Sequence, residues 1–172
     1  GVWGQNDTSY KLIWQEEFCY FGQPNPSLWN YDIGGHGWGN MEKQYYTRRR
    51  KNARVRFGKL HIVARHERLN ERNFTSARLV TRGKVSWQHG QIEIRAKIPS
   101  ARGILPAIWM LPAAWTFAND TIPLYGEIDI AEHAGYMKDT VHSALHVWPL
   151  QGHKRLTKTG LLRIPGFDKN YH

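Results

Sequence analysis

The feature of this sequence that most constrains its fold is a recurring two-residue alternation of polar and apolar side chains. Residues 91–98 read Gln-Ile-Glu-Ile-Arg-Ala-Lys-Ile, which predicts a strand with one face on a core and the other in water. Residues 54–65 alternate around Phe57-Gly58-Lys59 and predict a hairpin. Further strands are predicted at residues 11–18, 76–81, 104–110, 126–133, 141–147 and 161–164. No segment keeps a helical period over three turns, so the predicted fold class is an all-β sandwich or barrel.

The length and charge of the chain narrow the classes of protein that it can belong to. Its 172 residues suit a single domain spanning 1–172, and no internal repeat is found. The longest apolar run, residues 104–115, is interrupted by Pro106 and Pro112, so no membrane span is expected. The net charge of +10 suits a polyanionic partner or simply a basic soluble surface. Without a recognition helix or a stacking motif, no nucleic-acid partner is expected.

Three carboxyl side chains stand close together in residues 126–133, Gly-Glu-Ile-Asp-Ile-Ala-Glu-His. On a regular strand Glu127 and Asp129 share a face, while Glu132 comes one position too late. One extra residue, accommodated as a β-bulge, would bring Glu132 to the same face as the other two. The alternative is a strand whose solvent face merely happens to be acidic.

Carboxyl groups a few ångströms apart cannot all stay ionised, so at least one pKa rises. A retaining glycosidase needs this arrangement: an ionised carboxylate attacks the anomeric carbon, and a protonated one donates to the leaving oxygen. The spacing favours Glu127 as nucleophile and Glu132 as general acid and later base. Asp129 lies between them and can tune their protonation. Three acids in six residues of a chain with only 14 favour this reading over the acidic surface.

The Glu-x-Asp-x-x-Glu stretch resembles the catalytic signature of glycoside hydrolase family 16, in its laminarinase-like branch. Six ordered blocks carry the resemblance: residues 12–18, 35–47, 75–79, 90–99, 106–112 and 141–146. The resemblance implies a β-jelly-roll sandwich of two antiparallel sheets with a concave substrate cleft. It implies retaining hydrolysis of internal β-1,3 or mixed β-1,3/1,4 glucan linkages, outside the cell as a secreted enzyme.

The resemblance also implies a set of sugar-binding residues. Asn40 and Arg78 match positions that hydrogen-bond sugar hydroxyls, and His146 would lie near the general acid. Tryptophan rings are the usual stacking platforms for glucose, although a Trp is more often a packing residue. We favour the sugar reading for Trp109, and the remaining candidates are Trp38 and Trp115.

The resemblance implies no cofactor. His142 and His146 share a strand face, but no acidic residue stands at metalloprotease spacing, so no catalytic metal is expected. Glu17 matches a position that often helps to bind a structural calcium. The usual acidic partner near the C-terminus is absent here, which argues against that calcium.

The sequence departs from the family pattern at two cleft tryptophans and at its end. Leu105 and Ile122 stand where the family has Trp. With fewer stacking platforms for sugar rings, the resemblance does not fix which glycan is the substrate. Sandwiches of this kind run to roughly 200–250 residues, so we expect a C-terminally truncated domain whose last strands a second chain could supply. Two rival functions stay open: a sulfated-galactan hydrolase of the agar or carrageenan type, and a non-catalytic β-glucan recognition module.

Overall fold

The computed structural model describes residues 1–6, 9–113, 126–147 and 156–172. Within these ranges the chain forms fourteen β-strands and no helix, so the all-β prediction is confirmed. None of the described segments is a helix long and apolar enough to cross a bilayer. The chain divides into two compact units, Gly1–Glu93 and Ile94–His172. The single domain expected over 1–172 stays a prediction.

The described residues of the first unit form four small sheets. One has the order β10-β1-β2, and another has the order β4-β8-β7, in which β4 and β8 run parallel. Two antiparallel pairs, β3-β9 and β5-β6, complete the unit. The strands are β1 (Val2–Asn6), β2 (Ser9–Trp14), β3 (Asn30–Asp32), β4 (Gln44–Tyr46), β5 (Ala53–Val55), β6 (Leu60–Ile62), β7 (Arg65–Leu69), β8 (Arg72–Ser76), β9 (Arg78–Val80) and β10 (Gln91–Ile92).

A buried polar network fixes the middle of this first unit. The Asn52 side chain is fully buried, and its amide donates to Thr75 Oγ1 at 2.9 Å and to the Val63 carbonyl at 3.1 Å. Its carbonyl oxygen accepts from the Thr47 hydroxyl at 2.6 Å. Because unpaired buried polar groups are costly, these bonds specify how β5 lies against β8.

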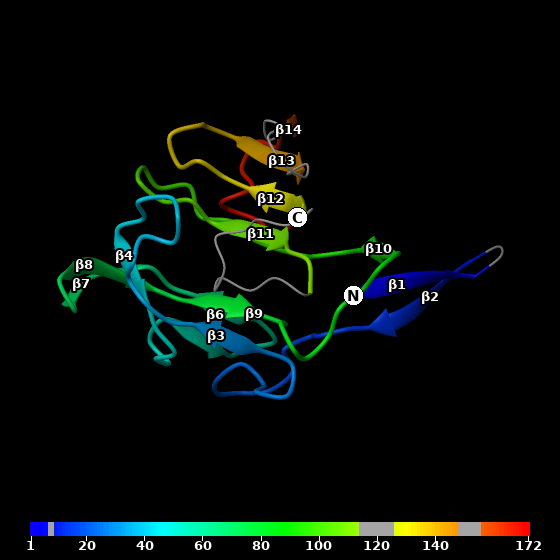
Figure 1. The fold of residues 1–172 in the computed structure, drawn as a ribbon, viewed down its shortest axis with the longest axis horizontal. Coiled ribbons are helices and arrows are strands. Elements are labelled where there is room, and N and C mark those ends of the chain that lie inside the picture. The colour runs from blue at the N-terminus through cyan, green and yellow to red at the C-terminus, as the bar shows by residue number, and fades with distance from the viewer. Residues whose placement is uncertain (7–8, 114–125, 148–155) are drawn as a thin grey trace, which may run out of the picture. The chain divides into compact units, whose positions relative to one another are not determined.

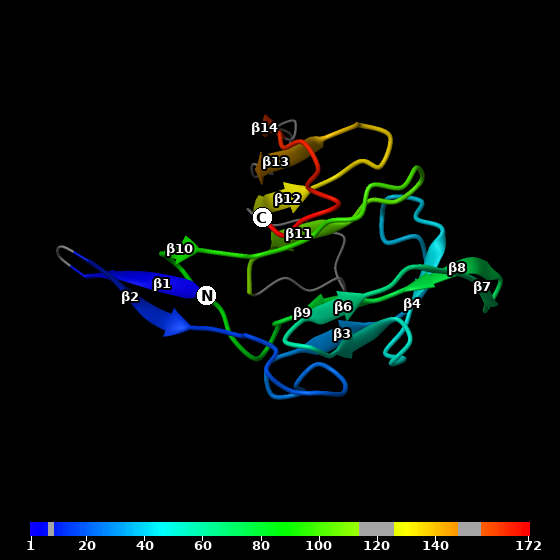
Figure 2. The same cartoon turned by 180° about the vertical axis from the view of Figure 1, so that it is seen from behind.

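The second unit contains one four-stranded antiparallel sheet in the order β11-β12-β13-β14. Its strands are β11 (Ala107–Met110), β12 (Gly126–Glu132), β13 (Thr140–Val147) and β14 (Leu156–Arg163). Figures 1 and 2 show the four strands side by side in this order, with β12 in the interior of the sheet. Four of the strands expected from sequence, at 104–110, 126–133, 141–147 and 161–164, overlap these strands and are therefore confirmed as neighbours, and β12 carries the acidic stretch.

The strand predicted at residues 91–98 is shorter than expected. Only Gln91–Ile92 forms a strand, β10, which pairs with β1. Beyond it, Ala96 exchanges two backbone hydrogen bonds with His172, at 2.8 and 2.9 Å, without a continuous ladder. Alternation indicates an extended chain, but a strand also needs a neighbour along its whole length. The hairpin predicted at 54–65 is confirmed, with β5 and β6 as its arms.

Candidate active site

The central strand β12 is irregular at the acidic stretch. Asp129 lies opposite Ala144 of β13, and Glu132 lies opposite His142, so three steps along β12 match two steps along β13. The pairing with β11 shifts at the same place. One residue of β12 is therefore extra, and the predicted β-bulge is confirmed.

The bulge brings the three carboxyl groups to one face of the sheet. Residues directly opposite each other in an antiparallel pair project to the same side. Glu127, Asp129 and Glu132 lie opposite alternate residues of β13, which itself pairs with β14 without a register shift. These opposite residues are His146, Ala144 and His142. Since alternate residues of a regular strand share a face, the three carboxyl groups share that face too.

Asp129 is the most deeply buried of the three, with 3% of its surface exposed. Its Oδ2 lies 2.9 Å from His146 Nε2, and His146 Nδ1 lies 2.9 Å from the Thr157 hydroxyl. An ionised carboxylate only accepts hydrogen bonds, so His146 Nε2 is the donor to such a carboxylate. Asp129 Oδ1 is buried and has no hydrogen-bond partner among the described residues. This oxygen can accept a proton shared with a neighbouring carboxyl group or a ligand.

The half-buried Glu132 has a carboxyl group whose pKa is raised. Burial raises the pKa of the Glu132 carboxyl above its usual value, and the negative charge of Asp129 raises it further. A carboxyl that keeps its proton at higher pH is suited to act as a general acid.

Trp109 and His142 flank the carboxyl groups on the neighbouring strands. Trp109 of β11 lies opposite Asp129, which puts the indole on the same face of the sheet. On the other side His142 Nε2 lies 3.0 Å from Met137 Sδ, so a loop residue reaches the histidine opposite Glu132. The structure thus gathers Trp109 and His146 with the three acids.

Three of the other predicted sugar-binding residues, Trp38, Asn40 and Arg78, belong to the first unit. Trp38 has φ of 52°, and its indole donates to the Gly34 carbonyl at 3.2 Å. The Arg78 guanidinium carbon lies 4.8 Å from the centre of the Trp38 ring, so these two residues are brought together. Asn40 is exposed in the turn that follows, where its backbone nitrogen donates to Gly37. Trp115 lies outside the described residues.

Two supporting residues were not found from the sequence. Asp32, 6% exposed, accepts from Arg78 Nε at 3.0 Å and from Arg82 Nη2 at 2.7 Å, and so fixes the arginine that stacks on Trp38. Thr157 supports His146 through its hydroxyl group. Neither pairing carries a local signal, because each depends on a strand register between distant segments. Among the described residues no cluster of three His, Cys, Asp or Glu has the geometry of a metal site.

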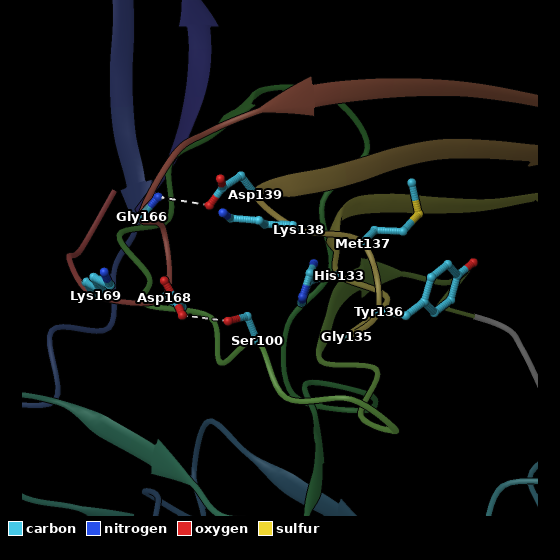
Figure 3. A pocket seen from close by; sticks show the side chains of 10 residues that line it. All are labelled: Ser100, His133, Gly135, Tyr136, Met137, Lys138, Asp139, Gly166, Asp168 and Lys169. Carbon is cyan, nitrogen blue, oxygen red and sulfur yellow. Dashed lines mark hydrogen bonds between the residues drawn. The ribbon is translucent and has the colours of Figure 1, made fainter.

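A polar pocket of about 390 Å³ lies beyond the end of β12. Figure 3 shows the Ser100 hydroxyl bonded to Asp168 and the Gly166 nitrogen bonded to Asp139, with the buried His133 ring beside them. Glu132 is not among the residues that line it, so this pocket differs from the carboxyl face.

Comparison with known proteins agrees with this geometry. The family profile of glycosyl hydrolases family 16 matches residues 40–172. A β-glucanase of Rhodothermus marinus is 51% identical over 164 residues, covering 95% of this chain and 57% of that protein. A glucan endo-1,3-β-glucosidase of Cryptopygus antarcticus is 36% identical over 171 residues, covering 95% of this chain and 61% of the relative.

The fold comparison agrees. The crystal structure of a laminarinase from Rhodothermus marinus superposes with a TM-score of 0.85 at 51% identity, covering 94% of this chain and 65% of that one. The predicted jelly-roll class is thereby confirmed. This chain spans less than two thirds of the length of these relatives. The second chain that would supply further strands stays a prediction.

Proposed function

This chain belongs to glycosyl hydrolases family 16, and from that premise we propose that it forms the catalytic part of a retaining endo-glycosidase acting on β-1,3 or mixed β-1,3/1,4 glucans. The observation that carries the proposal is the bulged strand β12, which gives three carboxyl groups a common face. The named activities of the similar proteins support the glucan as substrate.

In the proposed first step, the Glu127 carboxylate attacks the anomeric carbon while Glu132 transfers its proton to the departing glycosidic oxygen. A covalent glycosyl-enzyme forms, and the rest of the glucan leaves with a new hydroxyl group. Glu132, now ionised, takes a proton from water, whose oxygen attacks the same carbon and releases Glu127. Two inversions at the anomeric carbon give net retention of its configuration. This mechanism requires the two carboxyl groups to stand roughly 5–5.5 Å apart.

Asp129 has a separate part in this scheme. Its negative charge helps to keep Glu132 protonated until the leaving oxygen takes the proton. Its unpartnered Oδ1 can hold the proton of a neighbouring carboxyl group, and His146 fixes its other oxygen. We therefore assign Asp129 to tuning protonation rather than to attack.

Aromatic and polar side chains would bind the polymer. Trp109 is the proposed platform beside the acids, because sugar C–H faces pack against indole rings. Trp38, Asn40, Arg78, Trp115 and His146 are the further proposed sugar contacts. Because such a polymer does not enter a cell, we also propose a secreted protein.

The test is reducing-sugar release from laminarin, lichenan, agarose and carrageenan, together with the anomeric form of the first product by NMR. The proposal expects release from laminarin and lichenan with retention. Release from agarose or carrageenan alone would contradict the substrate, and glucan binding without any release would contradict the enzyme.

A further inference from the structure

The β5–β6 hairpin of the first unit closes through an unusual turn. Backbone bonds join Arg56 N to the Lys59 carbonyl at 3.0 Å and Lys59 N to the Arg56 carbonyl at 3.2 Å, which leaves a loop of two residues. Both loop residues have positive φ, 53° at Phe57 and 65° at Gly58. Turns of this kind favour Asn, Asp or Gly at the first position. A phenylalanine there is strained, because its Cβ crowds the backbone in the left-handed region.

The strained phenylalanine is also exposed, and it has an exposed partner. Phe57 is 64% exposed and Phe21 is 72% exposed. Their ring centres lie 5.7 Å apart at an interplanar angle of 86°, an edge-to-face pair. The neighbouring Gly22 is held to Val55 by two backbone bonds, which brings the two rings together. Among the described residues, core packing explains neither the strain nor the exposure, since both cost stability without burying the rings.

Positive charge surrounds this ring pair. The Arg56 guanidinium carbon lies 4.7 Å from the centre of the Phe57 ring, and Lys59 Nζ donates to the Phe57 carbonyl at 3.2 Å. The two segments that carry the rings, residues 20–23 and 54–60, contain three cations and no carboxylate. We call Phe21, Phe57 and Arg56 the aromatic-basic knob.

We propose that the aromatic-basic knob binds anionic polysaccharide, a chain of pyranose rings bearing sulfate or carboxylate groups. The phenyl rings would pack against the C–H faces of the sugar, and the guanidinium of Arg56 would pair with the anionic group. A lipid surface is the alternative occupant, and binding to vesicles tests it. The choice of polysaccharide rests on the proposed function, which brings this chain to a polysaccharide substrate.

The experiment measures binding to dextran sulfate by calorimetry, with uncharged dextran and vesicles of phosphatidylcholine and phosphatidylserine as separate probes. Phe57→Asn removes the ring and keeps a residue that tolerates positive φ, so the turn survives. Arg56→Gln removes the charge. Lys84→Gln is the matched control, because Lys84 is an exposed cation in another turn of the same unit.

We expect Phe57→Asn to weaken dextran sulfate binding about five-fold and Arg56→Gln about three-fold, with Lys84→Gln near the parent protein. Equal effects of all three variants would show non-specific charge attraction and overturn the proposal. Binding to vesicles alone would also overturn it. Laminarin hydrolysis, measured in parallel, should be unchanged in all three variants. Because binding and hydrolysis are measured separately, the binding result can be interpreted even if the protein does not hydrolyse laminarin.

Discussion

The carboxylate of Asp129 and the ring of His146 meet across the β12–β13 pair, 2.9 Å from oxygen to nitrogen, with both residues buried. This contact connects the middle acid of the bulged strand to β14 through Thr157. The protonation of the carboxyl groups and the stability of the sheet are therefore coupled at one position.

Replacing Asp129 by Asn should shift the pH dependence of hydrolysis. Burial and the Asp129 charge both raise the pKa of Glu132, and the substitution removes the second cause. The pKa of Glu132 then falls, so the proton needed by the leaving group is lost at lower pH. The alkaline limb of kcat/KM should move toward acid. A Glu71→Gln variant, which neutralises an exposed carboxylate in the other unit, should leave the profile in place.

Replacing Glu127 by Ala should lower glucan hydrolysis by about 10³-fold or more, because the proposed nucleophile is gone. Added azide should restore turnover of an activated β-glucoside by attacking from the vacated side. The product should be a glycosyl azide of inverted configuration, identified by NMR. Unchanged glucan hydrolysis in the variant would contradict the nucleophile assignment.

Replacing Glu132 by Gln should slow the hydrolysis of substrates with poor leaving groups more than that of substrates with good ones. Loss of a general acid costs about 10²- to 10⁴-fold when the leaving oxygen needs a proton. A dinitrophenyl glucoside needs none, so its first step should stay close to the parent rate, followed by accumulation of the covalent intermediate. Stopped-flow absorbance and intact-mass measurements would show both. Equal losses on laminarin and on the aryl glucoside would argue against the acid role.

Replacing His146 by Ala should destabilise the protein, because Asp129 would remain buried without its partner. The expected loss is about 2–4 kcal/mol in the free energy of unfolding, measured by urea denaturation. Leu145→Ala is the matched control, since the neighbouring Leu145 is 47% exposed and points to the other face of β13. A smaller loss for His146 than for Leu145 would contradict a structural contribution from the Asp129 contact.

The sequence predicts the acidic residues of this site better than it predicts the residues that hold them in place. The one-residue excess in Glu-x-Asp-x-x-Glu is a local signal, and it predicts both the bulge and the shared face of Glu127 and Glu132. The partners of these groups are not local. Thr157 reaches His146 only through the β13–β14 register, which alternation of hydrophobic residues does not specify.

In the fold too, pairings between neighbouring segments are predicted from the sequence, and pairings between distant segments are not. The hairpin around Phe57 follows from adjacent residues and is predicted, whereas the parallel pairing of β4 with β8 joins segments about thirty residues apart and is not. The strand expected at 91–98 ends after Ile92, and beyond Glu93 the described residues offer it only the two backbone bonds between Ala96 and His172, which do not form a continuous ladder. Asp32 supports Arg78 from a strand 46 positions earlier in the chain, which no sequence pattern marks.

The bulge also means that the spacing of the acids and the regularity of the strand depend on each other. Deleting Ile130 would let β12 pair evenly with β13 while every carboxyl group stayed in the chain. The shortened stretch Glu-Ile-Asp-Ala-Glu would then alternate regularly, so the three carboxyl groups would still project to one side of the sheet. The irregularity of β12 therefore compensates for one additional residue, and a protein that lost both would keep the same acidic surface.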